Sequence, residues 1–91
     1  MDASIEVILL KDGLTLISKC TRIIPEEIGH PDCLLIDPVL YNDKEPLEKA
    51  LYRFPGSHIT DDTKMRIHSD FILTMVAPTK KLLSEYLVAI S

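Results

Sequence analysis

The sequence predicts a small, mainly β domain in which five strands bend strongly into a barrel and a short helix follows at the C-terminus. Three observations lead to this prediction. Runs rich in β-branched and aromatic residues cover most of the chain, turn-forming residues separate these runs, and a clear helical pattern of apolar residues occurs near the end. The length of 91 residues and the hydrophobic content of 46% indicate one folded domain with a modest core.

The first two strands are expected to form a hairpin within residues 4–24. Asp12 and Gly13 lie between two β-rich runs, and this pair supplies the positive φ angles that a tight turn requires. Pro25 ends the second strand because proline has no N–H to donate to a ladder. A loop containing two prolines and a glycine follows. The third strand is expected at 33–41, with a bend or interruption at Asp37 and Pro38.

The segment 47–54 is compatible with a helix or with a strand. We expect a strand, because Tyr52 and Phe54 favour β structure and a Pro-Gly pair follows directly. The next run, 64–76, is expected to be the last strand. In the tail, apolar residues recur on one helical face, and Pro78 suits the first turn of a helix.

The end of the last strand raises the question of what covers it. Residues 71–76 are apolar at five of six positions, and the sequence offers no second sheet to bury both faces. A strand at the edge of a sheet invites pairing with another chain, and a head-to-tail contact between copies can close into a ring. We therefore expect a homo-oligomer whose subunit interface contains Phe71, Ile72, Leu73, Met75 and Val76.

Composition limits the class of protein. The net charge of −4 argues against nonspecific nucleic-acid binding over the whole surface, but it permits a local basic site. Cys20 and Cys33 are expected to be buried, reduced thiols. The N-terminus lacks the basic region of a signal peptide, and the apolar runs are too short to span a bilayer, so we expect a soluble cytoplasmic protein without membrane contact.

No pattern indicates catalysis. The groups His30–Cys33 and His58–Asp62 lack the paired spacing of a zinc site, and three glycines cannot build a glycine-rich phosphate loop. A nucleophilic pair of Cys33 with His30 is conceivable, but Cys33 begins an apolar strand. We expect no enzyme activity, no metal, no cofactor and no small-molecule substrate.

Two stretches resemble the signatures of the Sm-like family, which includes the LSm proteins and bacterial Hfq. "VILLKDGLTLIS" is similar to the first signature, with Asp12 and Gly13 at the turn and Ser18 where the family usually has glycine. "MRIHSDFILTMV" is similar to the second, with His68 and Ser69 in place of arginine and glycine. The pattern, including the C-terminal "KLLSEYL", is most similar to small Sm-like proteins of marine cyanobacterial phages, which would place the chain in the host cytoplasm.

The resemblance implies a fold and a candidate site. Sm-like proteins are five-stranded bent barrels, related in shape to SH3 domains, that join edge to edge into rings around a pore. The loop between the second and third strands and the second signature hold RNA bases, which carries over to His30 and Asp32 in a loop longer than usual, and to His68. Histidine can stack on a base and aspartate can accept a hydrogen bond from its edge. His30 could equally be an ordinary surface residue.

Cations on the strands would complete this site. In a ring of about five to seven copies, each cation is repeated in every subunit and could contact phosphates. The cations on or beside strands are Lys19, Arg22, Arg53, Lys64 and Arg66. The first choices for the site are Lys19, Arg22 and Arg66, and Arg66 lies on the same strand face as His68. Pairing with nearby carboxylates on a solvated sheet is the alternative.

Two functions therefore remain open. The first is a homo-oligomeric ring that binds single-stranded nucleic acid, RNA or DNA, and takes part in its processing. The alternative is a structural or assembly ring or adaptor, possible in a phage, without nucleic-acid binding. The net charge of −4 favours the alternative, and the shared face of Arg66 and His68 favours the first.

Overall fold

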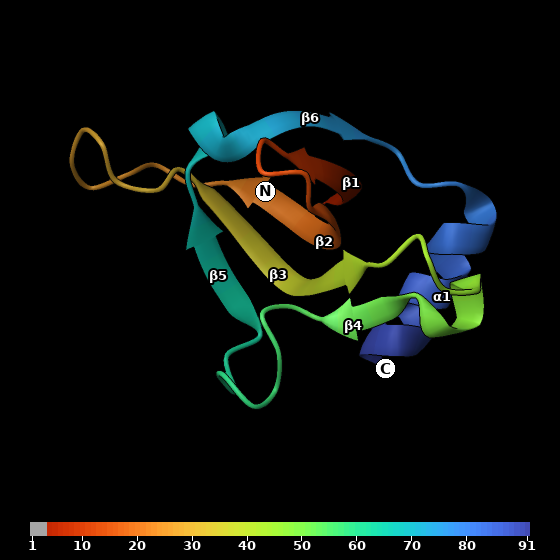
Figure 1. Ribbon diagram of the computed structural model, residues 1–91. Helices are drawn as coiled ribbons and strands as arrows, with labels where there is room; N and C mark the ends of the chain where they lie inside the picture. Colours follow the sequence, from red (N-terminus) through yellow and green to blue (C-terminus); the bar gives the residue numbers. More distant parts are fainter. Residues whose placement is uncertain (1–3) are drawn as a thin grey trace.

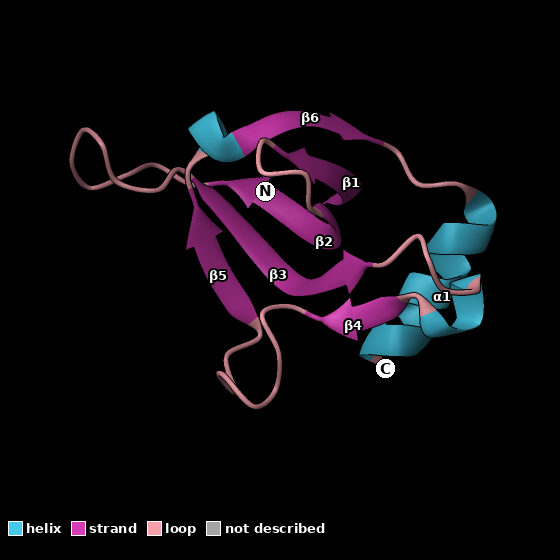
Figure 2. Ribbon diagram, viewed as in Figure 1, coloured by secondary structure: helices cyan, strands magenta, loops and turns pink. Residues whose placement is uncertain are grey.

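The computed structural model describes residues 4–91, so the first three residues of the N-terminal segment lie outside it. In these residues the chain forms one antiparallel sheet of six strands and a C-terminal α-helix (Figures 1 and 2). The strands are β1 (Ser4–Leu10), β2 (Thr15–Arg22), β3 (Cys33–Tyr41), β4 (Leu51–Arg53), β5 (Lys64–Ile67) and β6 (Ile72–Val76). The helix is α1 (Lys80–Ile90), and short 3-10 turns are η1 (Leu47–Lys49) and η2 (Ser69–Phe71).

The predicted hairpin is confirmed, since β1 and β2 are antiparallel neighbours. Gly13 has a φ of 96°, which a residue with a side chain rarely adopts. The backbone N–H of Leu10 donates to the carbonyl of Leu14 at 2.9 Å, and the Oδ1 of Asp12 accepts from the N–H of Leu14 at 3.0 Å. The turn is therefore made by the Asp-Gly pair that predicted it.

The central strand β3 has two partners on its outer side. β4 pairs with residues 39–41 of β3, and β5 pairs with residues 33–36. The strand order is β4-β3-β2-β1-β6, with β5 attached to the other half of β3. β4 and β5 thus act as one interrupted strand, separated by the loop 54–63.

The expectation of a single strand over 64–76 is wrong. The segment contains two strands, β5 and β6, with η2 between them. β5 pairs with β3, whereas β6 pairs with β1 on the opposite side of the sheet. The change from alternating to continuously apolar residues therefore coincides with a change of the strand with which the segment pairs, from β3 to β1. The strand expected at 47–54 is also shorter, because η1 precedes β4.

The mainly β domain with one C-terminal helix is confirmed, but the described residues form an open sheet of six strands in place of the expected five-stranded barrel. β6 pairs with β1 along one side, and in the described residues no strand pairs with its other side. β5 likewise pairs only with β3 within residues 4–91. Two edges of the sheet are consequently free to meet another chain.

The bend expected in the third strand is present. Across β2 and β3, Ile17 pairs with Val39 and Lys19 with Ile36, so the single residue Ser18 lies opposite two residues of β3. Asp37, the first of these two, has a φ of 53°, and Pro38 follows it. Such a bulge bends the strand and increases the local twist.

Each face of the sheet has its own apolar cluster. Ile8, Leu16, Cys20 and Leu35 form the buried centre of one face. The other, called here the helix face, buries Ile17, Val39 and Tyr86, and Tyr86 comes from α1. Helix α1 therefore covers only the part of the helix face near the end of β3 (Figure 1).

The helix begins at Lys80, two residues later than it would with Pro78 as its first residue. Thr79 is the N-cap, and its Oγ1 accepts a hydrogen bond from the N–H of Leu82 at 3.2 Å. Pro78 stands just before the cap and is not in the first turn. Pro78 thus favours the extended conformation that precedes the helix, and the Thr79 hydroxyl accepts a hydrogen bond from the first turn.

Candidate nucleic-acid interface

A pair of hydrogen bonds joins the loop between β2 and β3 to the turn between β5 and β6. Oδ1 of Asp32 accepts from the backbone N–H of Ser69 at 2.8 Å. Oδ2 of the same carboxylate accepts from the Ser69 hydroxyl at 2.8 Å. These residues are 37 positions apart in the sequence. The structure thus connects the two segments in which the sequence places the candidate residues Asp32 and His68.

The two donors also affect the acidity of Asp32. Hydrogen bonds from the Ser69 N–H and hydroxyl stabilise the carboxylate and lower the pKa of Asp32 below its usual value, and Arg22 lowers this pKa further. Asp32 is consequently ionised at neutral pH. With both of its oxygens engaged by Ser69, its main visible role is to hold the loop against the turn.

His30 and Arg66 line a common cleft of about 160 Å³ on the other side of that loop. Its remaining walls come from the loop, including Pro25, Glu26 and Pro31. The imidazole Nε2 of His30 lies 3.8 Å from a carboxylate oxygen of Glu27. The Sm-like resemblance implies that His30 lies beside His68, and the structure places His30 in a cleft with Arg66.

His68 links β5 to η2 and is only half exposed. Its ring centroid lies 6.4 Å from that of Phe71, with the ring planes tilted by 60°. Its carbonyl accepts a hydrogen bond from the N–H of Phe71 at 3.1 Å. Phe71 therefore lies beside the imidazole, and His68 directly precedes Ser69 of the Asp32–Ser69 link.

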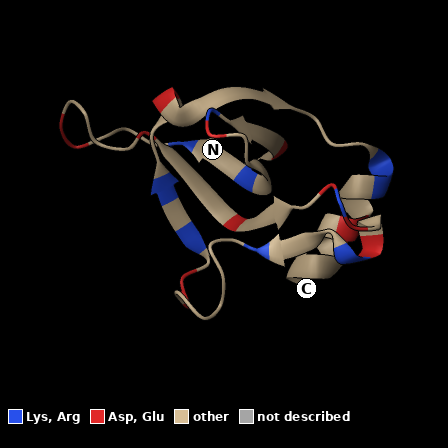
Figure 3. Cartoon of the chain, viewed as in Figure 1, with Lys and Arg blue, Asp and Glu red and all other residues tan. Residues whose placement is uncertain are grey.

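The candidate cations divide between the two faces of the sheet. Lys19 and Lys64 are both cross-strand partners of Ile36, and Arg66 is the partner of Leu34, so all three cations belong to the helix face. Arg22 pairs with Cys33 and belongs to the opposite face. Figure 3 shows basic residues on β2 and β5 and acidic residues on the loop between β2 and β3.

Lys19 is partly neutralised. Its Nζ lies 3.6 Å from Oδ2 of Asp37, and both side chains are about one-third exposed (36% and 29%). Arg66 and Lys64 are exposed. Of the three cations on the helix face, Arg66 and Lys64 are therefore the more available for an anionic ligand.

The outer strand β6 exposes most of the predicted interface residues. Phe71 is 62% exposed and Leu73 is 67% exposed, and large parts of Met75 and Val76 also face solvent. Ile72 differs from the others because it packs against the core of the first face. Within residues 4–91 the outer side of β6 has no strand partner, and exposed apolar residues along such an edge are the surface expected of a strand that meets another chain.

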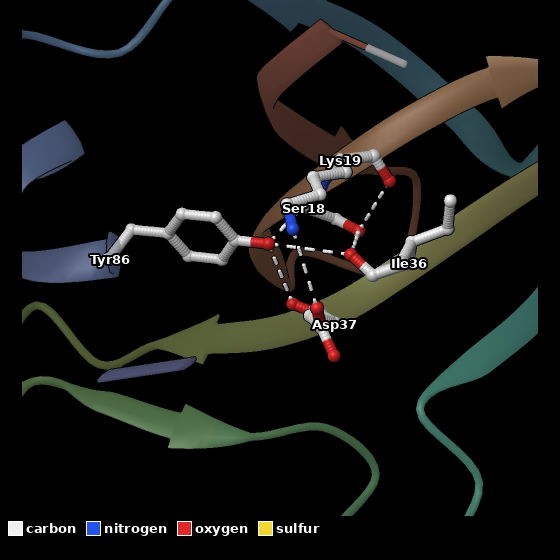
Figure 4. A network of polar contacts seen from close by, with 5 residues as sticks. All are labelled: Ser18, Lys19, Ile36, Asp37 and Tyr86. Carbon is white, nitrogen blue, oxygen red and sulfur yellow. Dashed lines mark hydrogen bonds and ion pairs between the residues drawn. The ribbon is translucent and has the colours of Figure 1, made fainter. Parts of the chain in front are cut away.

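A polar network near the bend lies outside the candidate site and was not anticipated from the sequence. The phenol of Tyr86 donates to the carbonyl of Asp37 at 2.8 Å and accepts from the N–H of Lys19 at 3.3 Å (Figure 4). The buried hydroxyl of Ser18 lies 2.8 Å from the carbonyl of Lys19 and 3.1 Å from that of Ile36. These contacts satisfy backbone groups that the bulge removes from the β2–β3 ladder.

Ser69 and Glu26 belong to the candidate site but were not predicted from the sequence. Ser69 was noticeable only as a replacement for glycine, and nothing local indicates that it binds Asp32. Glu26 is one of two adjacent glutamates in a loop, and only the loop conformation decides that it lines the cleft. A contact across 37 positions has no short-range sequence signal.

The expectation of buried thiols is confirmed. Cys20 and Cys33 are both buried and free. Burial is the main reason that the pKa of each thiol is raised, which keeps the reactive thiolate scarce at neutral pH. Within residues 4–91 no cluster of His, Cys, Asp or Glu side chains could hold a metal ion, and no helix there is long and apolar enough to cross a membrane.

Comparison with known families places the whole described domain in one group. Residues 3–91 match a family of unknown function, DUF6561. The chain belongs to this family. No curated protein matches the chain significantly. The DUF6561 match covers all six strands and the helix of the described residues.

Proposed function

We propose that this DUF6561 protein is an Sm-like protein that assembles into a homo-oligomeric ring and binds single-stranded nucleic acid. RNA is the expected ligand, and DNA is the alternative. The observation that carries the proposal is the Asp32–Ser69 link. In Sm-like rings the loop after the second strand and the second signature jointly hold bases. Here the corresponding segments are joined by two hydrogen bonds of 2.8 Å.

The sheet supports an Sm-like interpretation of the fold. The last strand, β6, returns to pair with β1 after a short turn, while β3 is bent and carries β4 and β5 on its outer side. This order leaves β6 and the β4/β5 side as the two free edges of the open sheet. Pairing of β6 with the opposite edge of a neighbouring copy would cover the exposed side chains of β6 and close a ring.

The chemistry proposed for the site is binding without catalysis. Bases would stack on His68 and against the guanidinium of Arg66, and phosphates would be held by Lys64 on the same face of the sheet, whereas Arg22 lies on the opposite face. Ring symmetry would repeat each contact in every subunit. The competing function is a structural ring or adaptor that uses the same edges but binds no nucleic acid, and the net charge of −4 is the observation in its favour.

The test is a double substitution, Arg66→Ala with His68→Ala, assayed by fluorescence anisotropy with labelled oligouridylate and oligothymidylate. Loss of one stacked base contact, worth roughly 1–3 kcal/mol, should weaken binding by about tenfold or more. Light scattering of the same samples checks that the oligomer persists.

The matched control is Arg53→Ala with His58→Ala, which removes an exposed arginine and an exposed histidine from β4 and the loop after it. We expect this control to bind like the wild type. If the wild type binds nucleic acid and the Arg66/His68 variant binds it equally well, these two residues do not belong to the site. Absence of binding by the wild type would favour the structural ring.

A further inference from the structure

The cleft between His30 and Arg66 has a size and a polarity that indicate its ligand. Its volume of about 160 Å³ is below the roughly 300–1,000 Å³ of pockets that enclose whole small molecules. A group of the size of a single planar base is therefore favoured over a complete nucleotide.

The charges around the cleft disfavour a phosphate. Glu26 and Arg66 both line it, and the carboxylate of Glu27 lies 3.8 Å from His30 on the same loop. In the lining, the carboxylate of Glu26 offsets the guanidinium of Arg66, and Glu27 adds negative charge on the same loop, so the cleft has no net positive charge to attract an anion. A neutral ligand with hydrogen-bond donors is compatible with the same charges, because an ionised carboxylate only accepts hydrogen bonds.

The walls of the cleft suit a flat ring. The rings of Pro25 and Pro31 provide apolar surface, and the imidazole of His30 and the guanidinium of Arg66 are planar groups that stack on bases. The two ends of the loop that forms these walls are held in place. Ile23 N–H donates to the carbonyl of Asp32 at 3.0 Å, and the carboxylate of Asp32 is bound to Ser69.

We infer that this cleft binds one guanine base of a single-stranded RNA, with Glu26 reading the base. This inference rests on the proposed function and adds its base specificity. Guanine presents two adjacent donors, N1–H and the N2 amino group, and these match the two oxygens of a carboxylate. Adenine and cytosine place an acceptor beside their amino group, and uracil flanks its single N–H with two carbonyl oxygens, so each would set an acceptor against the carboxylate.

The experiment uses the full chain and a labelled oligouridylate that carries one central guanosine, inosine or adenosine, or none. A bidentate contact of this kind is worth about 1–3 kcal/mol of discrimination, so guanosine should bind roughly tenfold tighter than adenosine. Inosine lacks the N2 amino group and should be intermediate. Glu26→Gln should remove the preference for guanosine while oligouridylate binding persists.

Glu45→Gln is the matched control, since Glu45 is an exposed acid in a different loop, and it should keep the preference. Equal binding of all the oligonucleotides, or a guanosine preference that survives in Glu26→Gln, would overturn the base assignment and leave the proposed function standing. Failure to bind any of them would overturn both.

Discussion

At the scale of single residues, Tyr86 is the side chain that joins the helix to the bent sheet. It is fully buried, and its hydroxyl forms hydrogen bonds with backbone groups of Lys19 and Asp37, at the bulge that interrupts the pairing of β2 and β3. Burial is the main cause that raises the pKa of this phenol, so it remains a hydrogen-bond donor at neutral pH. The ring packs against the apolar side chains of Ile17 and Val39, and the hydroxyl provides hydrogen-bond partners for backbone groups at the bulge.

Tyr86→Phe should keep the packing and lose the hydroxyl. The N–H of Lys19 and the carbonyl of Asp37 then lose their partner, which costs about 1–3 kcal/mol of the free energy of unfolding. Urea denaturation followed by circular dichroism measures the change. The control Tyr52→Phe alters a half-exposed tyrosine and should change stability by less than about 0.5 kcal/mol. Equal stability of the two variants would contradict the role given to the Tyr86 hydroxyl.

The Asp32–Ser69 link predicts a specific dependence on pH. Because the pKa of Asp32 is lowered in the folded state, its contribution to stability is present above the unfolded pKa and is lost as pH falls through the folded pKa. Ser69→Ala removes one of the donors. The variant should therefore be less stable than the wild type at neutral pH, and the difference should shrink in acid.

Urea denaturation at both pH values, together with an NMR titration of the Asp32 carboxyl, tests this prediction. The pKa of Asp32 should move upward, toward its usual value, in Ser69→Ala. Ser57→Ala, at an exposed serine of another loop, is the control. A stability difference that is independent of pH would show that Ser69 acts by some route other than the carboxylate.

At the scale of elements, the short helix α1 depends on its first turn. Leu82, Tyr86 and Ile90 pack against the sheet, but an isolated helix of 11 residues is marginal in water. The hydrogen bond from Leu82 N–H to the Thr79 hydroxyl supplies one partner for the unpaired groups at the helix start. Since α1 carries Tyr86, the cap also supports the docking of the helix on the bend.

Thr79→Ala should destabilise the protein by about 1 kcal/mol, the usual cost of losing an N-cap. Thr79→Ser keeps a hydroxyl in the same place and should restore most of this loss. Thermal or urea denaturation of the two variants compares them directly. If alanine and serine were equivalent at this position, the cap would have no energetic role.

At the scale of the whole molecule, the open sheet is the feature that requires an explanation. Within residues 4–91 no second layer of structure covers the outer side of β6, and most of its apolar side chains are exposed. Lys, Pro or a covering loop commonly protects the edge of a sheet from pairing, and β6 contains neither a charge nor a proline. This edge therefore has the features expected of a strand that pairs with another chain.

Light scattering after size-exclusion chromatography should give a stable mass several times the 10.3 kDa of the chain. Leu73→Lys with Met75→Lys should reduce this mass to that of the monomer, because charges would have to be buried in the contact. The control is Leu87→Lys with Val88→Lys, since these two apolar residues of α1 are comparably exposed. A monomeric wild type, or an unchanged oligomer in the β6 variant, would contradict pairing through this edge.

The sequence by itself determined the elements whose signals are local. The Asp12-Gly13 turn, the bend at Asp37-Pro38 and the helix near the C-terminus follow from φ preferences, missing N–H groups and periodicity within a few residues. The burial of Cys20 and Cys33 also followed from their apolar neighbours.

Only the tertiary structure decided how these elements meet. The segment 64–76 became two strands because its halves pair with different neighbours, and the Asp32–Ser69 link and the His30–Arg66 cleft join residues far apart in the chain. The free edges of the sheet likewise depend on which strands pair. Pairing and loop conformation are non-local, since their free energy depends on the whole set of contacts and not on the residues of one segment.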